Sequence, residues 1–165
     1  MPATIPESSV APLEPTVVPA GHGAVFHAFG DTIQMKLGAA QTGGRMAVGL
    51  GLVQAGGGPP PHRHRAEDEM FIVVDGTMSY LINGTWQDVG PGGVAFMPRG
   101  VPHTFCNRSD RPASHWIITT PSGFETFFSR CADVFAAAGS GPPDMARVMQ
   151  ICGEHGIEFL EPGGE

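Results

Sequence analysis

Large and small or polar side chains alternate with a period of two along much of the chain from Ala24 onward. Ile33, Met35 and Leu37 alternate with polar residues, and residues 46–52 alternate Met, Val or Leu with Ala or Gly. Because successive side chains of a strand point to opposite faces, this pattern predicts β-strands. Further short strands are expected over residues 70–74, 78–82, 94–97, 103–107 and 114–120.

Turn signals separate these strands. Asp75-Gly76 and Asn83-Gly84 stand between apolar runs, which is typical of β-hairpins. Many short strands at spacings of roughly ten residues predict an all-β sandwich, jelly roll or barrel.

The pattern becomes helical after Pro121. Apolar residues recur at helical spacing over 122–139, where Ser122 and Glu125 form a candidate capping box. A second helix is expected over residues 143–155, ending at Gly156. We expect the apolar stripes of both helices to pack against the barrel or a partner subunit.

The 165 residues therefore divide into three parts: a loose, proline-containing arm over residues 1–20, a β-barrel over 21–121 and a helical tail over 122–165. The net charge is −7 with nine Lys and Arg, which argues against nucleic acid as a partner. There is no long apolar run that would span a membrane and no secretory signal pattern. Three widely spaced cysteines argue against a disulfide framework, so a cytoplasmic protein is expected.

Three histidines and a glutamate suggest the chemistry. His62 and His64 lie two residues apart, so in an extended segment both rings project to the same side. Glu69 has the parity of the apolar Phe71, and a charged side chain on the inward face needs a partner. His103 shares the parity of Phe105 on a later strand and is expected to point inward as well. Arg63, Arg65, Glu67 and Asp68 read most simply as a solvated rim.

Three imidazoles and one carboxylate suit a divalent transition metal ion (Fe, Mn, Ni, Co, Cu or Zn) better than Ca or Mg. Four protein ligands leave one or two open positions on a five- or six-coordinate ion. The set therefore favours chemistry at the metal over a purely structural role.

Two sequence motifs resemble those of a known protein family. Gly56, His62, His64, Glu69 and Gly76 fit the first cupin motif, G-x5-H-x-H-x4-E-x6-G. The second motif, G-x5-P-x-G-x2-H-x3-N, is matched by Gly92, Pro98, Gly100, His103 and Asn107. The chain resembles the cupin superfamily, in a single-domain (cupin-2 type) form. The layout around the motifs is also similar to that of the quercetin-dioxygenase-like cupins.

The resemblance implies a double-stranded β-helix, the jelly-roll barrel of cupins, with His62, His64, Glu69 and His103 as metal ligands near its axis. Glu69 would serve as ligand and proton acceptor, and a homodimer is expected. Asn107 is expected to have a structural role, closing a turn. Candidate residues of the substrate pocket are Phe71, Val73, Tyr80, Phe96, Phe105, His115 and Trp116.

The leading hypothesis is a metal-dependent dioxygenase that acts on a small aromatic or enolisable molecule. A cupin that binds or senses a small molecule without turning it over is one alternative. A metal-assisted isomerase or lyase is another alternative, although such an enzyme would require a more polar and basic pocket.

Overall fold

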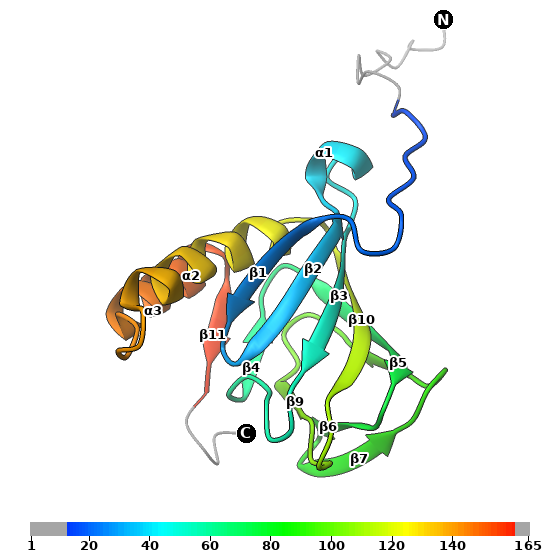
Figure 1. Cartoon of the computed structure of the whole chain (residues 1–165), viewed down its shortest axis with the longest axis vertical. Helices are drawn as coiled ribbons and strands as arrows, with labels where there is room; N and C mark the ends of the chain where they lie inside the picture. The colour runs from blue at the N-terminus through cyan, green and yellow to red at the C-terminus, as the bar shows by residue number, and fades with distance from the viewer. Residues whose placement is uncertain (1–12, 161–165) are drawn as a thin grey trace, which may run out of the picture.

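The computed structural model describes residues 13–160, which form two antiparallel β-sheets with two helices along one side (Figure 1). The first sheet has the strand order β1-β2-β3-β10-β5-β8, and the second has the order β11-β4-β9-β6-β7. The expected all-β, double-stranded β-helix architecture is confirmed.

The strands of the first sheet are β1 (Ala24–Ala28), β2 (Asp31–Leu37), β3 (Ala47–Val53), β10 (Ala113–Thr120), β5 (Asp68–Asp75) and β8 (Val94–Met97). Those of the second sheet are β11 (Ile157–Phe159), β4 (His62–His64), β9 (His103–Cys106), β6 (Met78–Ile82) and β7 (Thr85–Val89). The helices are α1 (Ala39–Thr42), α2 (Phe124–Ala138) and α3 (Met145–Glu154).

The inner face of β3 is its small-residue face. Ala47, Gly49 and Gly51 are buried, whereas Leu52 on the other face is 42% exposed. A Cβ added at Gly49 would lie 2.8 Å from Ile33 Cγ2, and one at Gly51 would lie 3.0 Å from His115 Nε2. Side chains from the neighbouring strands β2 and β10 thus occupy the space that larger residues on β3 would need.

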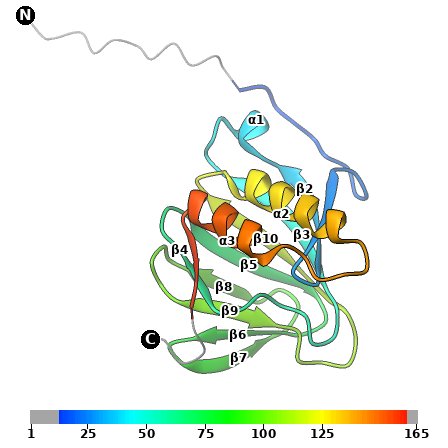
Figure 2. The same cartoon turned by 90° about the vertical axis from the view of Figure 1, so that its left-hand side faces the viewer.

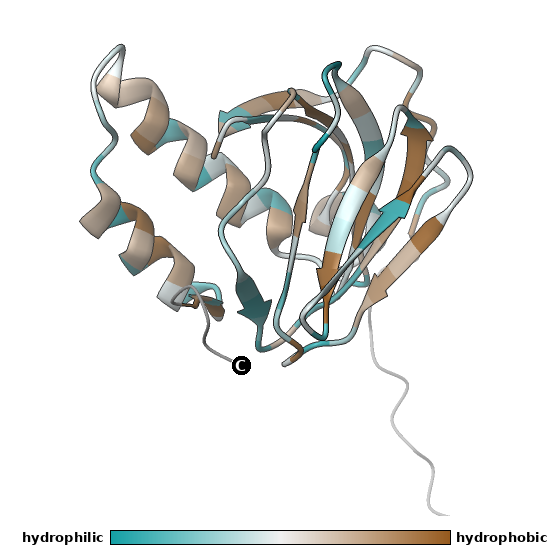
Figure 3. Ribbon diagram, turned by 90° about the horizontal axis from the view of Figure 1, so that it is seen from below, coloured by the Kyte–Doolittle hydropathy of each residue, from teal (hydrophilic) through white to brown (hydrophobic). Residues whose placement is uncertain are grey.

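The two C-terminal helices lie side by side along one side of the barrel (Figures 2 and 3). Helix α2 packs against β1 as well as against α3. Its N-cap is Gly123 rather than the expected Ser122, because Gly123 adopts a φ of 135° and donates its amide hydrogen to Glu125 Oε2. Helix α3 is capped by Asp144, whose side chain accepts a hydrogen bond from the Arg147 amide.

Strands β7 and β11 and the short helix α1 were not predicted from the sequence. Strand β7 is mostly exposed, and its sequence Thr-Trp-Gln-Asp-Val has little alternation to reveal it. Strand β11 lies in the tail that was expected to be helical. It pairs antiparallel with β4, Ile157 opposite His64 and Phe159 opposite His62. The segment after α3 therefore extends the second sheet and lies beside the histidine-bearing strand.

Much of the expected N-terminal arm, residues 1–12, lies outside the described residues. Residues 13–18 form neither helix nor strand. Over the range 13–160, no helix has the length and apolarity required to span a membrane.

Candidate metal centre

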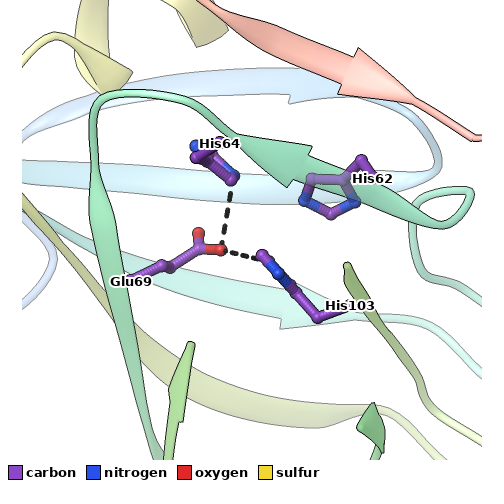
Figure 4. A group of neighbouring side chains, drawn as sticks. All are labelled: His62, His64, Glu69 and His103. Carbon is purple, nitrogen blue, oxygen red and sulfur yellow. Dashed lines mark hydrogen bonds and ion pairs between the residues drawn. The ribbon is translucent and has the colours of Figure 1, made fainter. Parts of the chain in front are cut away.

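Four buried side chains converge between the two sheets. His62 and His64 come from β4, and His103 on β9 lies directly opposite His62 in the strand register. Glu69 comes from β5 in the other sheet, and its carboxylate points toward the imidazoles (Figure 4). One ligand atom from each of the four lies within 4.8 Å of each of the others. The structure thus brings together the predicted ligand set.

Backbone carbonyls orient two of the imidazoles. Nδ1 of His62 lies 2.9 Å from the Pro60 carbonyl oxygen, and Nδ1 of His103 lies 2.9 Å from that of Val101. A carbonyl oxygen only accepts, so each Nδ1 carries the hydrogen, and the neutral ring has its lone pair on Nε2. This arrangement is the one in which a histidine binds a metal through Nε2 while its other nitrogen is held by the protein.

The Glu69 carboxylate faces the Nε2 atoms of His103 and His64. Its Oε2 lies 3.0 Å from His103 Nε2 and 3.5 Å from His64 Nε2. Two ligand atoms bound at about 2.1 Å to a single ion would lie roughly 3.0–3.4 Å apart, so these separations suit a shared cation. Both ring nitrogens of His64 are buried without a hydrogen-bond partner among the residues that the structure describes. The residues present therefore fit a transition metal ion.

Electrostatics favour the ligating forms of His62 and Glu69. At His64, burial acts to lower the pKa, but the nearby carboxylates outweigh it and raise that pKa. Burial lowers the pKa of His62 to about 3, with the neighbouring His103 acting in the same direction, so its imidazole is neutral at physiological pH. Burial alone would raise the pKa of Glu69, but the surrounding imidazoles outweigh it and lower that pKa to about 2. A neutral imidazole and an ionised carboxylate are the forms that bind metals.

A further carboxylate stands behind His64. Glu67 is only 8% exposed, and its Oε2 lies 3.6 Å from His64 Nδ1. The expectation that Glu67 belongs to a solvated rim is therefore wrong. Its neighbour Asp68 does lie at the rim, paired with Arg99 at 2.8 Å. Glu67 is in place to orient the His64 ring so that Nε2 faces Glu69.

A cavity of about 40 Å³ adjoins the ligand set. Its walls are largely aromatic and aliphatic, with Asp31 and Glu69 as the carboxylates. It is lined by Phe29, Asp31, Ile33, Pro59, His62, His64, Glu69, Phe105, Ile117, Phe124, Phe127, Phe128, Ile157 and Phe159.

The tail and one hairpin turn supply the aromatic residues of this wall that the sequence did not reveal. Phe124, Phe127 and Phe128 come from α2, and Phe159 comes from β11. Phe29 sits in the turn between β1 and β2 with a φ of 56°, which is rare for a bulky residue. Its ring contacts those of Phe127, Phe128, Phe135 and Phe159 at centroid distances of 5.1–6.3 Å.

Of the predicted pocket residues, Phe105 lines the cavity. Phe71, Val73, Tyr80 and His115 are fully buried within the barrel but are not part of the cavity wall. Tyr80 Oη lies 2.9 Å from His115 Nδ1, and burial lowers the pKa of His115 to about 4. These four residues fill the core.

Phe96 and Trp116 do not line the cavity, so the expectation for these two residues is wrong. Phe96 is 56% exposed on β8. Trp116 lies on the opposite face of β10 from the buried His115 and Ile117. Both belong to the outer face of the first sheet, which is itself rich in apolar side chains.

Asn107 holds together the loops that follow β3 and β9. Its side-chain amide donates hydrogen bonds to the carbonyl oxygens of Val53 and Arg111, and its Oδ1 accepts from Ser109. Its backbone pairs with Gly56 and Gly57. The structural role expected for this residue is observed, and it supports the loop that leads into β4.

Comparisons with known proteins agree with this architecture. Residues 49–119 match the family model of the cupin domain. A polyketide cyclase, RemF from Streptomyces resistomycificus, is 24% identical, with a TM-score of 0.57 over 65% of this chain and 80% of that chain. An RmlC-like cupin from Shewanella frigidimarina is 15% identical, with a TM-score of 0.59 over 68% and 96%.

A cupin-superfamily sugar phosphate isomerase from Silicibacter pomeroyi is 26% identical, with a TM-score of 0.51 over 61% of this chain and 69% of that chain. No curated protein sequence matches the chain. The domain match covers both histidine-bearing motifs, and the fold is shared with these structures. The chain therefore resembles the cupin superfamily over residues 49–119, the part that matches the cupin domain model.

Proposed function

We propose that this protein is a metal-dependent enzyme acting on a small aromatic or enolisable molecule, with dioxygenation as the reaction. One observation carries the proposal: His62, His64 and Glu69 of the four-residue ligand set line a cavity walled by six phenylalanines. A pocket that is mostly apolar with a few convergent polar groups is typical of small-molecule sites. Here the polar groups are three residues of the metal ligand set and Asp31.

His62, His64, Glu69 and His103 would hold the ion. Once bound, a divalent transition metal acts as a Lewis acid that stabilises negative charge on a substrate oxygen. Glu69 is also proposed to accept a proton from the substrate, since it is the carboxylate within the ligand set. The phenylalanines orient an aromatic ring by edge and face contacts and keep water away from the reacting atoms.

The cavity must widen to admit a substrate. An engineered cavity of about 150 Å³ binds benzene, whereas the space here is about 40 Å³. Phe159 and the α2 phenylalanines belong to elements packed against the barrel from outside its sheets or at their edge. Movement of these elements, rather than of the central strands, is the proposed route of entry.

A sugar phosphate is a poor candidate substrate. Within residues 13–160, none of the side chains that line the cavity is a lysine or an arginine, and Asp31 and Glu69 are acidic. A phosphate would therefore lack the cationic partners that usually bind it. This lining disfavours the isomerase activity named for the Silicibacter protein and favours an uncharged or phenolic ligand.

The test combines metal analysis with oxygen uptake. Protein purified without added metal is analysed for transition metals, then assayed with flavonols and aryl diketones. We expect about one ion per chain and oxygen consumption with at least one substrate. His62→Ala should lose both, whereas His22→Ala, on an exposed histidine, should lose neither. A metal-loaded protein that consumes no oxygen but converts substrate under nitrogen would show a non-oxidative enzyme instead, and binding without turnover would show a sensor.

A further inference from the structure

A second carboxyl group lines the cavity apart from the ligand set. Asp31 is the first residue of β2, immediately after the Phe29-Gly30 turn. In the first sheet, β3 and β10 separate its strand from β5, which carries Glu69. The cavity thus has carboxyl groups from two separated strands, one among the metal ligands and one at a distance from them.

Within residues 13–160, Asp31 has no structural partner that would explain it. The residue is only 6% exposed, and its buried Oδ1 has no hydrogen-bond partner in this part of the chain. In the strand register it lies opposite Val53 on β3, and its side chain points inward like that of Ile33. An apolar side chain at this position would have no desolvation penalty. Burying an unpaired carboxyl group is costly, so its presence calls for a role.

The surroundings of Asp31 bring the pKa of its carboxyl group close to physiological pH. The other titratable groups that line the cavity are His62, His64 and Glu69. Burial is the cause that raises the pKa of Asp31 from its ordinary value of 3.8 to about 7. Both protonation states are then populated at physiological pH, which is the condition for efficient general acid–base catalysis.

We propose that Asp31 is a second catalytic carboxyl group, which exchanges a proton with an enolisable or phenolic substrate whose oxygen lies at the ligand set. This inference rests on the proposed function. The ionised Asp31 takes a proton from a C–H or O–H bond of the substrate, and the electron pair of that bond stays on the substrate as enolate or phenolate. The protonated Asp31 returns the proton in the reverse step, so the exchange needs no oxidant or reductant.

The proposal also describes the substrate. The molecule must present an oxygen to the ligand set and an acidic hydrogen to Asp31, with an apolar ring against the phenylalanines between them. Aryl 1,3-diketones and polyphenols have this combination, whereas a simple hydrocarbon or a sugar phosphate does not.

The experiment follows the keto–enol interconversion of benzoylacetone by its absorbance, under nitrogen, with protein loaded with redox-inert Zn²⁺. We expect the native protein to accelerate the interconversion, with a rate that depends on pH around neutrality. Asp31→Asn should lower the acceleration by about 100-fold and remove that pH dependence. Asp75→Asn, at an exposed aspartate of β5, should match the native protein, and thermal unfolding checks that each variant is folded.

A second readout does not depend on turnover. In carbon-13 NMR spectra of the Zn²⁺-loaded protein labelled at aspartate carboxyls, the chemical shift of one resonance should change with pH around neutrality. That resonance should be absent from the spectrum of Asp31→Asn. The proposal is overturned if Asp31→Asn accelerates as the native protein does, if the native protein gives no acceleration, or if no aspartate titrates above its ordinary range. A His62→Ala variant that still accelerates while Asp31→Asn does not would instead refute the metal's part in the proposed function and support that of Asp31.

Discussion

His62 and His103 lie directly opposite one another on the adjacent antiparallel strands β4 and β9, with ring centroids 4.6 Å apart. The spacing is set by the strand register, because side chains opposite each other on paired strands are held at short range. The two rings are also fixed by hydrogen bonds to carbonyls two residues earlier in the chain. Half of the ligand set is thus prearranged by the backbone before any ion arrives.

The first prediction concerns metal removal. A metal that binds only the folded chain stabilises it, by about 2.7 kcal/mol when the free ion stands at 100 times its dissociation constant. A chelator should therefore lower the unfolding temperature of the native protein, measured by circular dichroism. His103→Ala should unfold at the same temperature with and without the chelator. An equal response in both proteins would show that the chelator acts elsewhere.

The second prediction tests Glu67 as the support of His64. Glu67→Gln should weaken metal affinity by roughly 10–100-fold, the usual cost of losing a carboxylate that orients a ligating histidine. Affinity is measured by competition with a chromogenic chelator. Asp68→Asn is the matched control, because Asp68 is the adjacent residue but pairs with Arg99 at the rim. If both variants bind the metal as tightly as the native protein, Glu67 does not support the site.

The third prediction addresses entry into the cavity. Phe159→Ala removes a ring from the wall beside His62, at a centroid distance of 6.1 Å. Because the cavity has to widen for an aromatic ligand, the association rate of a flavonol should rise by roughly one decade. Stopped-flow absorbance measures this rate. Trp86→Ala, on the exposed strand β7, should leave it unchanged. A slower association in Phe159→Ala would mean that the ring attracts the ligand more than it blocks it.

The fourth prediction follows from the raised pKa of Asp31. The folded protein holds this proton up to about pH 7, whereas the unfolded chain loses it near its ordinary value of 3.8. The stability of the native protein relative to Asp31→Asn should therefore be greatest below about pH 4, fall as pH rises, and level off above about pH 7. The full change should be at most about 4 kcal/mol. Urea unfolding of both proteins at about pH 4 and about pH 8 measures it. A pH-independent difference would contradict the raised pKa.

The fifth prediction concerns assembly. The outer face of the first sheet exposes Val94, Phe96 and Leu52, and the chain is expected to form a homodimer. If this face is the contact, Phe96→Lys should shift sedimentation toward the monomer, because a charge buried in an interface is costly. Val25→Lys on β1, at the far edge of the sheet, is the control. A native protein that sediments as a monomer would refute the expectation.

The strands and the ligand set could be predicted because both follow from patterns between residues that are close in the sequence. Alternation marks strands such as β2 and β3, and the two-residue spacing places His62 and His64 on one face of their strand. Glu69 was placed inward by the parity that it shares with Phe71. Which face of each strand is buried was harder to infer. Phe96 and Trp116 are large and apolar, yet they lie on the outer face, while the buried side of β3 is formed by alanine, glycine and one valine. Size alone therefore does not identify the inner face of a curved sheet.

The aromatic wall and the two unexpected carboxyl groups depend on tertiary packing. Phe127 and Phe159 reach the cavity only because α2 packs on β1 and β11 pairs with β4, and no sequence periodicity specifies those contacts. Glu67 resembled a member of a charged surface run. Asp31 follows a Phe-Gly turn, where an aspartate is ordinarily read as a turn residue.

Strand β11 joins positions that are far apart in the chain, since Ile157 pairs with His64. During synthesis, the two histidines of β4 emerge long before the segment that will cover their edge. Until that segment docks, the ligand strand has a free edge and the site lacks part of its apolar wall. The order in which metal uptake and docking of the tail occur would then decide how readily the folded protein exchanges its ion.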